Sequence, residues 1–246
     1  MPSATKRHRP RTKKSSEPDR GNSVALVVAQ LRSMIVTGKL SPGTWMIEAE
    51  LAERIGVSRT PIRGALQWLE REGFLMSVNS GSKNRVQVAP MTKEDARELY
   101  SIIGHIEGLA ARLTAQLPSE QRGKVIRELR KMNEGLDALV RAHRPEPNRI
   151  FDLDSGFHRT IVDASGGPRL TGLHRTTQLQ AERYWRLYAS AIVDELGQSV
   201  REHDVIIDAI ERGDPDRAEI GSQRNWANGV ERLAGVIDTL GERGSW

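Results

Sequence analysis

The chain lacks cysteine altogether. This absence excludes disulfide bridges, catalysis by a thiolate and metal sites built from cysteine. The chain also lacks an apolar run long enough to span a bilayer, and its N-terminus is too polar to hold the apolar core of a signal peptide. We therefore expect a cytoplasmic protein.

The chain does contain enough apolar sequence for a folded core. Its 246 residues are 37% apolar, which argues against wholesale disorder and leaves room for two domains. Charge is divided unevenly along it. Residues 1–20 carry seven basic and two acidic residues and residues 21–90 carry eight and five, whereas residues 91–246 carry 22 and 25. This asymmetry indicates that the first third of the chain binds a polyanion and that the rest has another task.

Residues 1–22 are predicted to form a disordered basic arm. They combine proline, serine and charge with no apolar periodicity. Such an arm either solubilises the protein or contacts DNA phosphates, and the sequence favours neither over the other.

Residues 23–90 predict a winged helix-turn-helix, in which three helices precede a β-hairpin. Helical periodicity begins at Val24, a second short helix follows the turn SPG, and the turn GVS leads to a third helix with Ser58 at its N-cap. The extended runs FLMSV and RVQV then flank the loop NSGSKN, as in a hairpin.

The start of the third helix is the candidate DNA contact. In this motif that end enters the major groove. Its free N–H groups attract phosphate, and arginines there can reach guanine edges. The plainer interpretation is that Ser58 only caps the helix and the arginines are solvated. The basic charge and the hairpin favour DNA, with expected contacts at Ser58, Arg59, Thr60, Arg63, Ser80, Gly81, Lys83 and Arg85.

Residues 91–242 predict helices alone, so the fold class is mainly α. TKED at residues 92–95 is a capping box that begins the first helix. Proline and glycine then separate further helices, expected at 119–142, 148–164, 168–193, 198–212 and 215–240. With no strand pattern, this half should be a helical bundle.

The first domain resembles the DNA-binding domain of GntR-type bacterial transcription regulators. The resemblance covers about residues 24–90 and is carried by LSPGTWMIEAELAERIGVSRTPIRGALQWLEREGFL. It implies that Arg59, Thr60 and Arg63 contact the operator and that Gly81 lies at the tip of the wing.

The second domain is similar to the FadR C-terminal type of effector domain, called FCD, over most of residues 92–240. The matching segments are ELYSIIGHIEGLAARLTA, DLDSGFH, GGPRL and REHDVIIDAIERGDPDRAE. The resemblance implies six or seven helices around a cavity that binds a small metabolite and often a divalent metal, zinc or a similar ion.

A metal site is predicted at Asp154 and His158, which are four residues apart and so share one helical face. The resemblance adds His203 and puts Asn225 where the family has its last histidine. An amide oxygen is a weaker ligand than imidazole for zinc-like ions. A hydrogen-bonded polar cluster without metal is the alternative. The remaining histidines of the bundle are expected to be solvated or satisfied locally: His105, His143 and His174.

The effector pocket is predicted from the same resemblance. Many relatives carry an arginine on the first bundle helix that pairs with an acid effector, and Ile103 occupies that position here. A simple hydroxy acid held by that arginine is therefore disfavoured. Aromatic residues either line the pocket or form core and dimer contacts: Tyr100, Tyr184, Trp185, Tyr188 and Trp226.

These features predict a ligand-responsive transcription regulator, in the repressor arrangement that the resemblance implies, and not an enzyme. A homodimer on a palindromic operator would place two recognition helices roughly 34 Å apart. One alternative is an architectural DNA-binding protein. The other is a metal-dependent hydrolase, but a general base is not evident. The nearest candidate is Glu202, and as the direct neighbour of His203 on a helix it should point in another direction.

Overall fold

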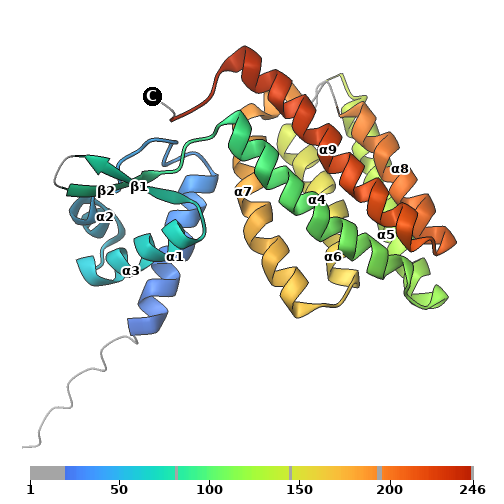
Figure 1. The fold of residues 1–246 in the computed structure, drawn as a ribbon, viewed down its shortest axis with the longest axis horizontal. Coiled ribbons are helices and arrows are strands. Elements are labelled where there is room, and N and C mark those ends of the chain that lie inside the picture. Colours follow the sequence, from blue (N-terminus) through green and yellow to red (C-terminus); the bar gives the residue numbers. More distant parts are fainter. Residues whose placement is uncertain (1–19, 81–82, 144–145, 193–195, 245–246) are drawn as a thin grey trace, which may run out of the picture.

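The computed structural model describes residues 20–80, 83–143, 146–192 and 196–244. The N-terminal part contains α1 (Arg20–Val36), α2 (Glu48–Ile55), α3 (Arg59–Arg71), β1 (Leu75–Ser80) and β2 (Lys83–Val88) (Figure 1). The two strands are antiparallel. This is the predicted three-helix domain with a hairpin. Because α1 begins at Arg20, residues 20–22 are helical and do not belong to an arm; the other arm residues lie outside the described ranges.

The turn between α2 and α3 depends on one glycine. Gly56 has φ of 79°, which favours glycine, and its N–H returns to the carbonyl of Ala52 to end α2. The next helix then buries one face, formed by Ile62, Ala65, Leu66 and Leu69. These side chains join α1 and the hairpin in one apolar core. The opposite face of α3 is left to solvent.

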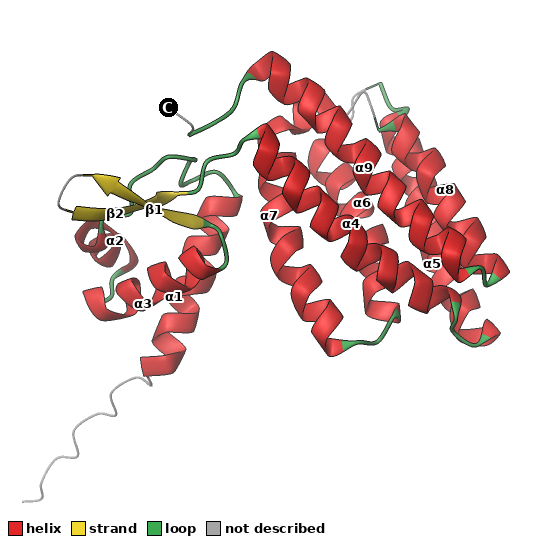
Figure 2. Ribbon diagram, in the orientation of Figure 1, coloured by secondary structure: helices red, strands yellow, loops and turns green. Residues whose placement is uncertain are grey.

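The C-terminal part consists of helices within the described ranges (Figure 2). They are α4 (Lys93–Ala115), α5 (Ser119–Val140), α6 (Pro147–Ala164), α7 (Pro168–Ile192), α8 (Gly197–Arg212) and α9 (Pro215–Leu240). Their bounds agree with the predicted ones to within two residues, since proline and glycine mark most of the ends.

Helices α4 and α9 run side by side because two glycines let their backbones approach. A Cβ atom at Gly104 would lie 3.0 Å from Cβ of Trp226, and one at Gly108 would lie 2.9 Å from Cγ of Gln223. Larger residues at these positions would push α9 away. This close packing brings Trp226 into the centre of the bundle.

The predicted capping box is half formed. Thr92 Oγ1 accepts a hydrogen bond from the N–H of Asp95 at 3.1 Å. The Asp95 carboxylate does not return to the cap; it accepts from the hydroxyl of Tyr184 at 2.5 Å. The start of α4 is thus tied to α7.

Helix α7 lies on the side of the bundle that is nearest to α1 (Figure 1). Its Leu179 packs against the core of the N-terminal domain. Gln180 donates to the carbonyl of Glu72, at the end of α3, at 2.6 Å. Arg183 donates to the carbonyl of Ala89, after β2, also at 2.6 Å. The two domains therefore meet through the middle of α7.

Candidate DNA-binding and ligand-binding sites

The N-terminal end of α3 is an exposed polar surface. Ser58, Arg59, Thr60 and Arg63 are all exposed there. Ser58 occupies the N-cap position in an extended conformation, but its side chain makes no capping hydrogen bond. The first N–H groups of the helix therefore keep their capacity for an outside acceptor such as phosphate.

Arg63 has a partner that sequence reasoning missed. Its guanidinium forms two parallel hydrogen bonds with the carboxylate of Glu48 on α2, at 2.9 and 2.8 Å. The hydrogen bond to Arg63 lowers the pKa of Glu48 below its ordinary value, although burial opposes this. The Arg63 side chain stays 65% exposed, so the pair sits on the surface and orients the guanidinium beside the helix end.

The hairpin carries the other predicted DNA contacts. Ser80 and Lys83 pair across the strand ends, and their side chains lie outside the described structure, as does Gly81. Arg85 is exposed, and its guanidinium lies 5.8 Å from the ring centre of Trp45, which is itself 42% exposed. Such cation–π contact holds the arginine on the surface of the hairpin.

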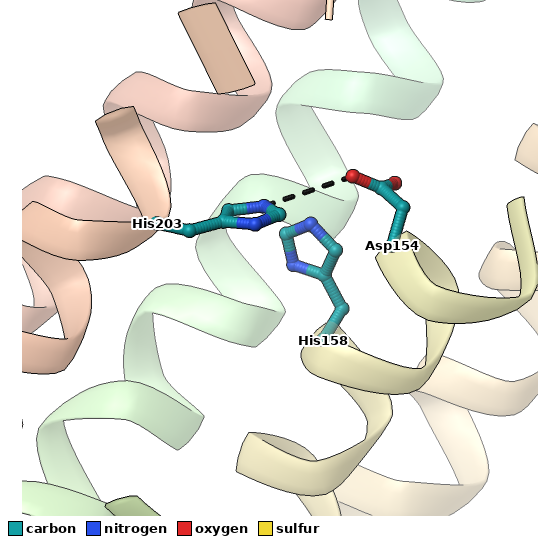
Figure 3. A group of neighbouring side chains, drawn as sticks. All are labelled: Asp154, His158 and His203. Carbon is teal, nitrogen blue, oxygen red and sulfur yellow. Dashed lines mark ion pairs between the residues drawn. The ribbon is translucent and has the colours of Figure 1, made fainter. Parts of the chain in front are cut away.

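The three predicted metal ligands come together inside the bundle. Asp154 and His158 lie on α6 and His203 on α8 (Figure 3). One ligand atom from each residue lies within 4.8 Å of the others. Nε2 of His203 is 3.7 Å from Oδ1 of Asp154. A single ion between these atoms would reach all three side chains.

The tautomer of His203 follows from its neighbour Asn133. The amide nitrogen of Asn133 donates to the carbonyl of Val200 at 3.0 Å and to Asp204 at 2.8 Å. Its amide oxygen is therefore the atom that faces Nδ1 of His203 at 3.1 Å, and it can only accept. Nδ1 thus carries the proton, and Nε2 presents a lone pair toward Asp154.

Burial reinforces this assignment. The pKa of His203 is lowered well below its ordinary value because burial disfavours the charged ring, and nearby His158 adds to the effect. Within the described part of the chain, buried Nε2 of His203 has no hydrogen-bond partner. A buried lone pair of this kind, facing a carboxylate, fits a cation between them.

His158 is held by Glu107 of α4. Nδ1 of His158 lies 2.5 Å from Oε2 of Glu107, although the contact does not meet full hydrogen-bond geometry. Burial alone would lower the pKa of His158, but Glu107, and then Asp154, raise it to about 9. The pKa of Asp154 is raised, chiefly by burial. Placing positive charge in this cluster, as a proton or as a cation, is therefore favourable.

Asn225 of α9 is buried and lines the same cavity as Asp154 and His158. Its amide nitrogen donates to Oε2 of Glu202 at 2.8 Å. Glu202 also accepts from Asn228 and Arg232. Glu202 does not belong to the group of three possible ligands, but it bonds to Asn225 and Arg232 of the cavity wall, and the sequence did not predict these contacts.

A cavity that is partly open to solvent is lined in part by Asp154 and His158. Of the residues predicted for the pocket, Tyr100 and Trp226 line it, together with Trp185. Sequence reasoning missed other polar and apolar lining residues on α6, α7, α8 and α9 and just before α8, including Phe151, Ser155, Gln178, Glu182, Leu196, Ser199 and Arg232.

Ile103, Tyr184 and Tyr188 are core residues and do not line this cavity. Each is at most 1% exposed. The hydroxyl of Tyr184 bonds to α4, and that of Tyr188 donates to the carbonyl of Gly241 at 2.9 Å. Placing these three in the effector pocket is corrected, because an aromatic pattern on a helix does not distinguish a cavity wall from a packed core.

The other bundle histidines differ from one another. His105 is exposed and its Nδ1 lies 2.7 Å from the carbonyl of Ser101, and His143 is exposed. His174 is buried, with Nε2 2.7 Å from Oε1 of Glu107. His174 is thus satisfied by the same carboxylate that holds His158.

Comparison with known proteins decides the family. Residues 24–82 match bacterial regulatory proteins of the gntR family, and residues 98–226 match the FCD domain. The chain belongs to the GntR family, in its FCD-containing form. Regulators of this family are DNA-binding proteins and not enzymes, so this GntR protein is a transcriptional regulator.

Individual relatives support this placement of the GntR protein. It is 32% identical over 146 residues to the uncharacterised regulator YdhC of Bacillus subtilis, a match that spans 58% of this chain and 61% of YdhC. It is 30% identical over 199 residues to the probable D-xylose utilization operon transcriptional repressor of Paenarthrobacter nicotinovorans, across 78% of this chain and 82% of that protein.

The solved structure of McbR/YncC from E. coli shares the fold of this GntR protein, with a TM-score of 0.62 at 20% identity over 86% of this chain and 96% of that one.

Over the described ranges, the GntR protein has no helix with the length and apolar character needed to cross a bilayer.

Proposed function

We propose that this regulator is a ligand-responsive repressor that binds a palindromic operator as a homodimer. The observation that carries the proposal is the position of α7, which lines the cavity and also contacts the DNA-binding domain. Repression is supported by the xylose-operon relative, whose name describes it as a repressor. A protein with this task would act in the cytoplasm.

The DNA-binding end is α3 with the hairpin. Its uncapped N–H groups and Arg59 are available to a phosphate or a guanine edge. Glu48 would hold the guanidinium of Arg63 in a fixed orientation, and Arg63 would donate hydrogen bonds to DNA from the side that faces the groove. Arg85 and the hairpin tip would position the domain on the neighbouring backbone. The basic arm would add phosphate contacts.

The bundle holds a divalent cation in this proposal, zinc or a similar ion. Asp154, His158 and His203 would be its ligands, with Asn225 as a weaker fourth. The orphaned Nε2 of His203 fits this role. A bound cation would supply positive charge and open coordination positions to a polar effector group.

The cavity suits a small effector that has both polar and apolar groups. Its wall includes the polar residues Asp154 and His158 and the apolar residues Phe151, Trp185 and Leu196. Arg232 also lines the cavity, with its side chain 11% exposed. This guanidinium on α9 supplies the cationic group that Ile103 does not, so an anionic effector group can pair there in exchange for Glu202.

Helix α7 would carry the effect of binding to DNA. Gln178, Ala181, Glu182 and Trp185 line the cavity, while Leu179 and its neighbours meet the DNA-binding domain. A shift of α7 that improves contact with the effector would therefore strain the bonds to Glu72 and Ala89. The spacing of two recognition helices in a dimer would change with it.

Footprinting and native mass spectrometry of protein purified without chelator test the proposal. The expected results are a protected palindrome, a dimer mass and an added metal mass. Even coverage of DNA without a preferred site would instead favour an architectural DNA-binding protein. A dimer without metal would leave a polar pocket in which protonated His158 replaces the cation.

A further inference from the structure

A second shell of contacts around the cluster centres on Glu107. This carboxylate is 1% exposed, in the middle of α4. A carboxyl group in such a place is costly unless its oxygens have hydrogen-bonding partners.

Polar groups from three other helices lie against its two oxygens. Nδ1 of His158 on α6 lies 2.5 Å from Oε2, Nε1 of Trp226 on α9 donates to Oε2 at 2.6 Å, and Nε2 of His174 on α7 lies 2.7 Å from Oε1. Gly104 and Gly108 lie on either side of Glu107 on α4. Gly104 leaves room for Trp226 of α9, and Gly108 leaves room for Gln223. No step of DNA binding requires this arrangement.

The contacts determine which atom His158 offers to a cation. Two lone pairs would repel each other at the 2.5 Å that separates Nδ1 of His158 from Oε2 of Glu107, so the proton of the neutral ring is on Nδ1, although the N–H is not aligned for a full hydrogen bond. In the cation-bound state the lone pair is then on Nε2. Figure 3 shows a ring nitrogen of His158 directed toward Asp154 and His203. Asn133 acts in the same way on His203 through Nδ1.

We propose that Glu107 is the positioning residue of the cation site: it fixes the ring and tautomer of His158 so that Nε2 faces Asp154 and His203. It makes no contact with the cation itself. The inference rests on the proposed metal site and goes beyond it. It states that a residue of α4, which is not itself a ligand, controls how strongly and in what geometry the ligands on α6 and α8 bind the cation.

The same carboxylate ties the site to α7. Oε1 holds His174, seven residues before Ala181 in the cavity wall and six before Gln180 at the domain contact. A change in the orientation of Glu107 would therefore alter its contacts with both His158, a proposed cation ligand, and His174 of α7. Helix α7 is the one that contacts the DNA-binding domain.

Cobalt(II) titration of the full-length protein tests the role of Glu107. Glu107→Gln keeps the shape of the side chain but leaves one accepting oxygen for three donors. We expect it to weaken cobalt binding by about 10- to 100-fold and to alter the visible absorption of the bound cobalt, with the circular dichroism of the folded protein unchanged. Glu98→Gln is the matched control, since Glu98 is exposed on the same helix, and it should bind like wild type.

The outcomes separate the two proposals. Wild-type protein that binds no cobalt would overturn the metal site and this inference with it. Wild type that binds cobalt, with Glu107→Gln within about twofold of it and spectrally identical, would overturn the role of Glu107 alone. If Glu107→Gln does not fold, Glu107→Asp decides: its shorter side chain should still weaken binding by about fivefold or more, and wild-type affinity would reject the inference.

Discussion

Nε2 of His203 and Oδ1 of Asp154 face each other at 3.7 Å, and both atoms are acceptors. Asn133 determines which nitrogen of His203 is unprotonated. Its amide oxygen accepts from Nδ1 of His203, so the proton stays on Nδ1 and the lone pair is on Nε2. Two lone pairs this close, with the histidine fully buried, need a proton or a cation between them. That relationship is the strongest sign of what the bundle binds.

Asp154→Asn tests the cation site through stability. A cation that binds only the folded chain stabilises it by about 2.7 kcal/mol at 100 times its dissociation constant. Adding zinc should therefore raise the melting temperature of wild type by several degrees, and this shift should largely vanish in Asp154→Asn. Asp152→Asn is the control, because Asp152 is exposed on the same helix. An equal shift in all three proteins would contradict the assignment.

Arg59→Ala tests the recognition end of α3. The loss of a base or phosphate contact should weaken specific operator binding by about 1 to 3 kcal/mol while the fold is kept. Gel-shift titration at fixed salt measures the change. Arg71→Ala, exposed at the other end of α3, should leave binding nearly unchanged. Equal losses in the two variants would mean that the helix end is not placed in the groove.

Arg183→Met tests the connection between the domains. Arg183 is 4% exposed and burial lowers its pKa, yet it donates to the carbonyl of Ala89. Its removal should cost about 1 to 3 kcal/mol of stability, because the partly buried carbonyl of Ala89 loses its donor. It should also reduce the effect of added metal on operator affinity. The control is Arg186→Met, which alters an exposed arginine one turn further along α7; similar behaviour of both variants would argue against transmission through α7.

Acid unfolding tests the ionised state of Glu107. Its pKa is about 2 in the folded chain against an ordinary value of 4.5. The depressed pKa stabilises the fold above about pH 4.5, and this contribution is lost as the pH falls from 4.5 toward 2. Urea unfolding across this window should show a shallower pH dependence for Glu107→Gln than for wild type. The Glu98→Gln variant should keep the wild-type slope, and identical slopes in all three would show that Glu107 does not contribute.

Local sequence determined the elements and the surfaces of this protein. Glycine and proline mark the turns, so the helix bounds could be read almost to the residue, and the apolar face of α3 follows from helical periodicity. The i, i+4 pair Asp154 and His158 is likewise a local feature. Helix ends, helical periodicity and i, i+4 pairs all depend only on residues that are close to one another along the chain.

Tertiary packing decided the rest, because it joins residues far apart in sequence. Glu107 meets His174 and Trp226 only once α4 lies beside α7 and α9, and Arg63 meets Glu48 only when α2 crosses α3. The aromatic residues of α7 show the limit most clearly: Trp185 faces the cavity while Tyr184, its direct neighbour, is bonded to α4. Periodicity tells which side chains are inside, and the neighbouring helices determine whether the inside at that point is core or cavity.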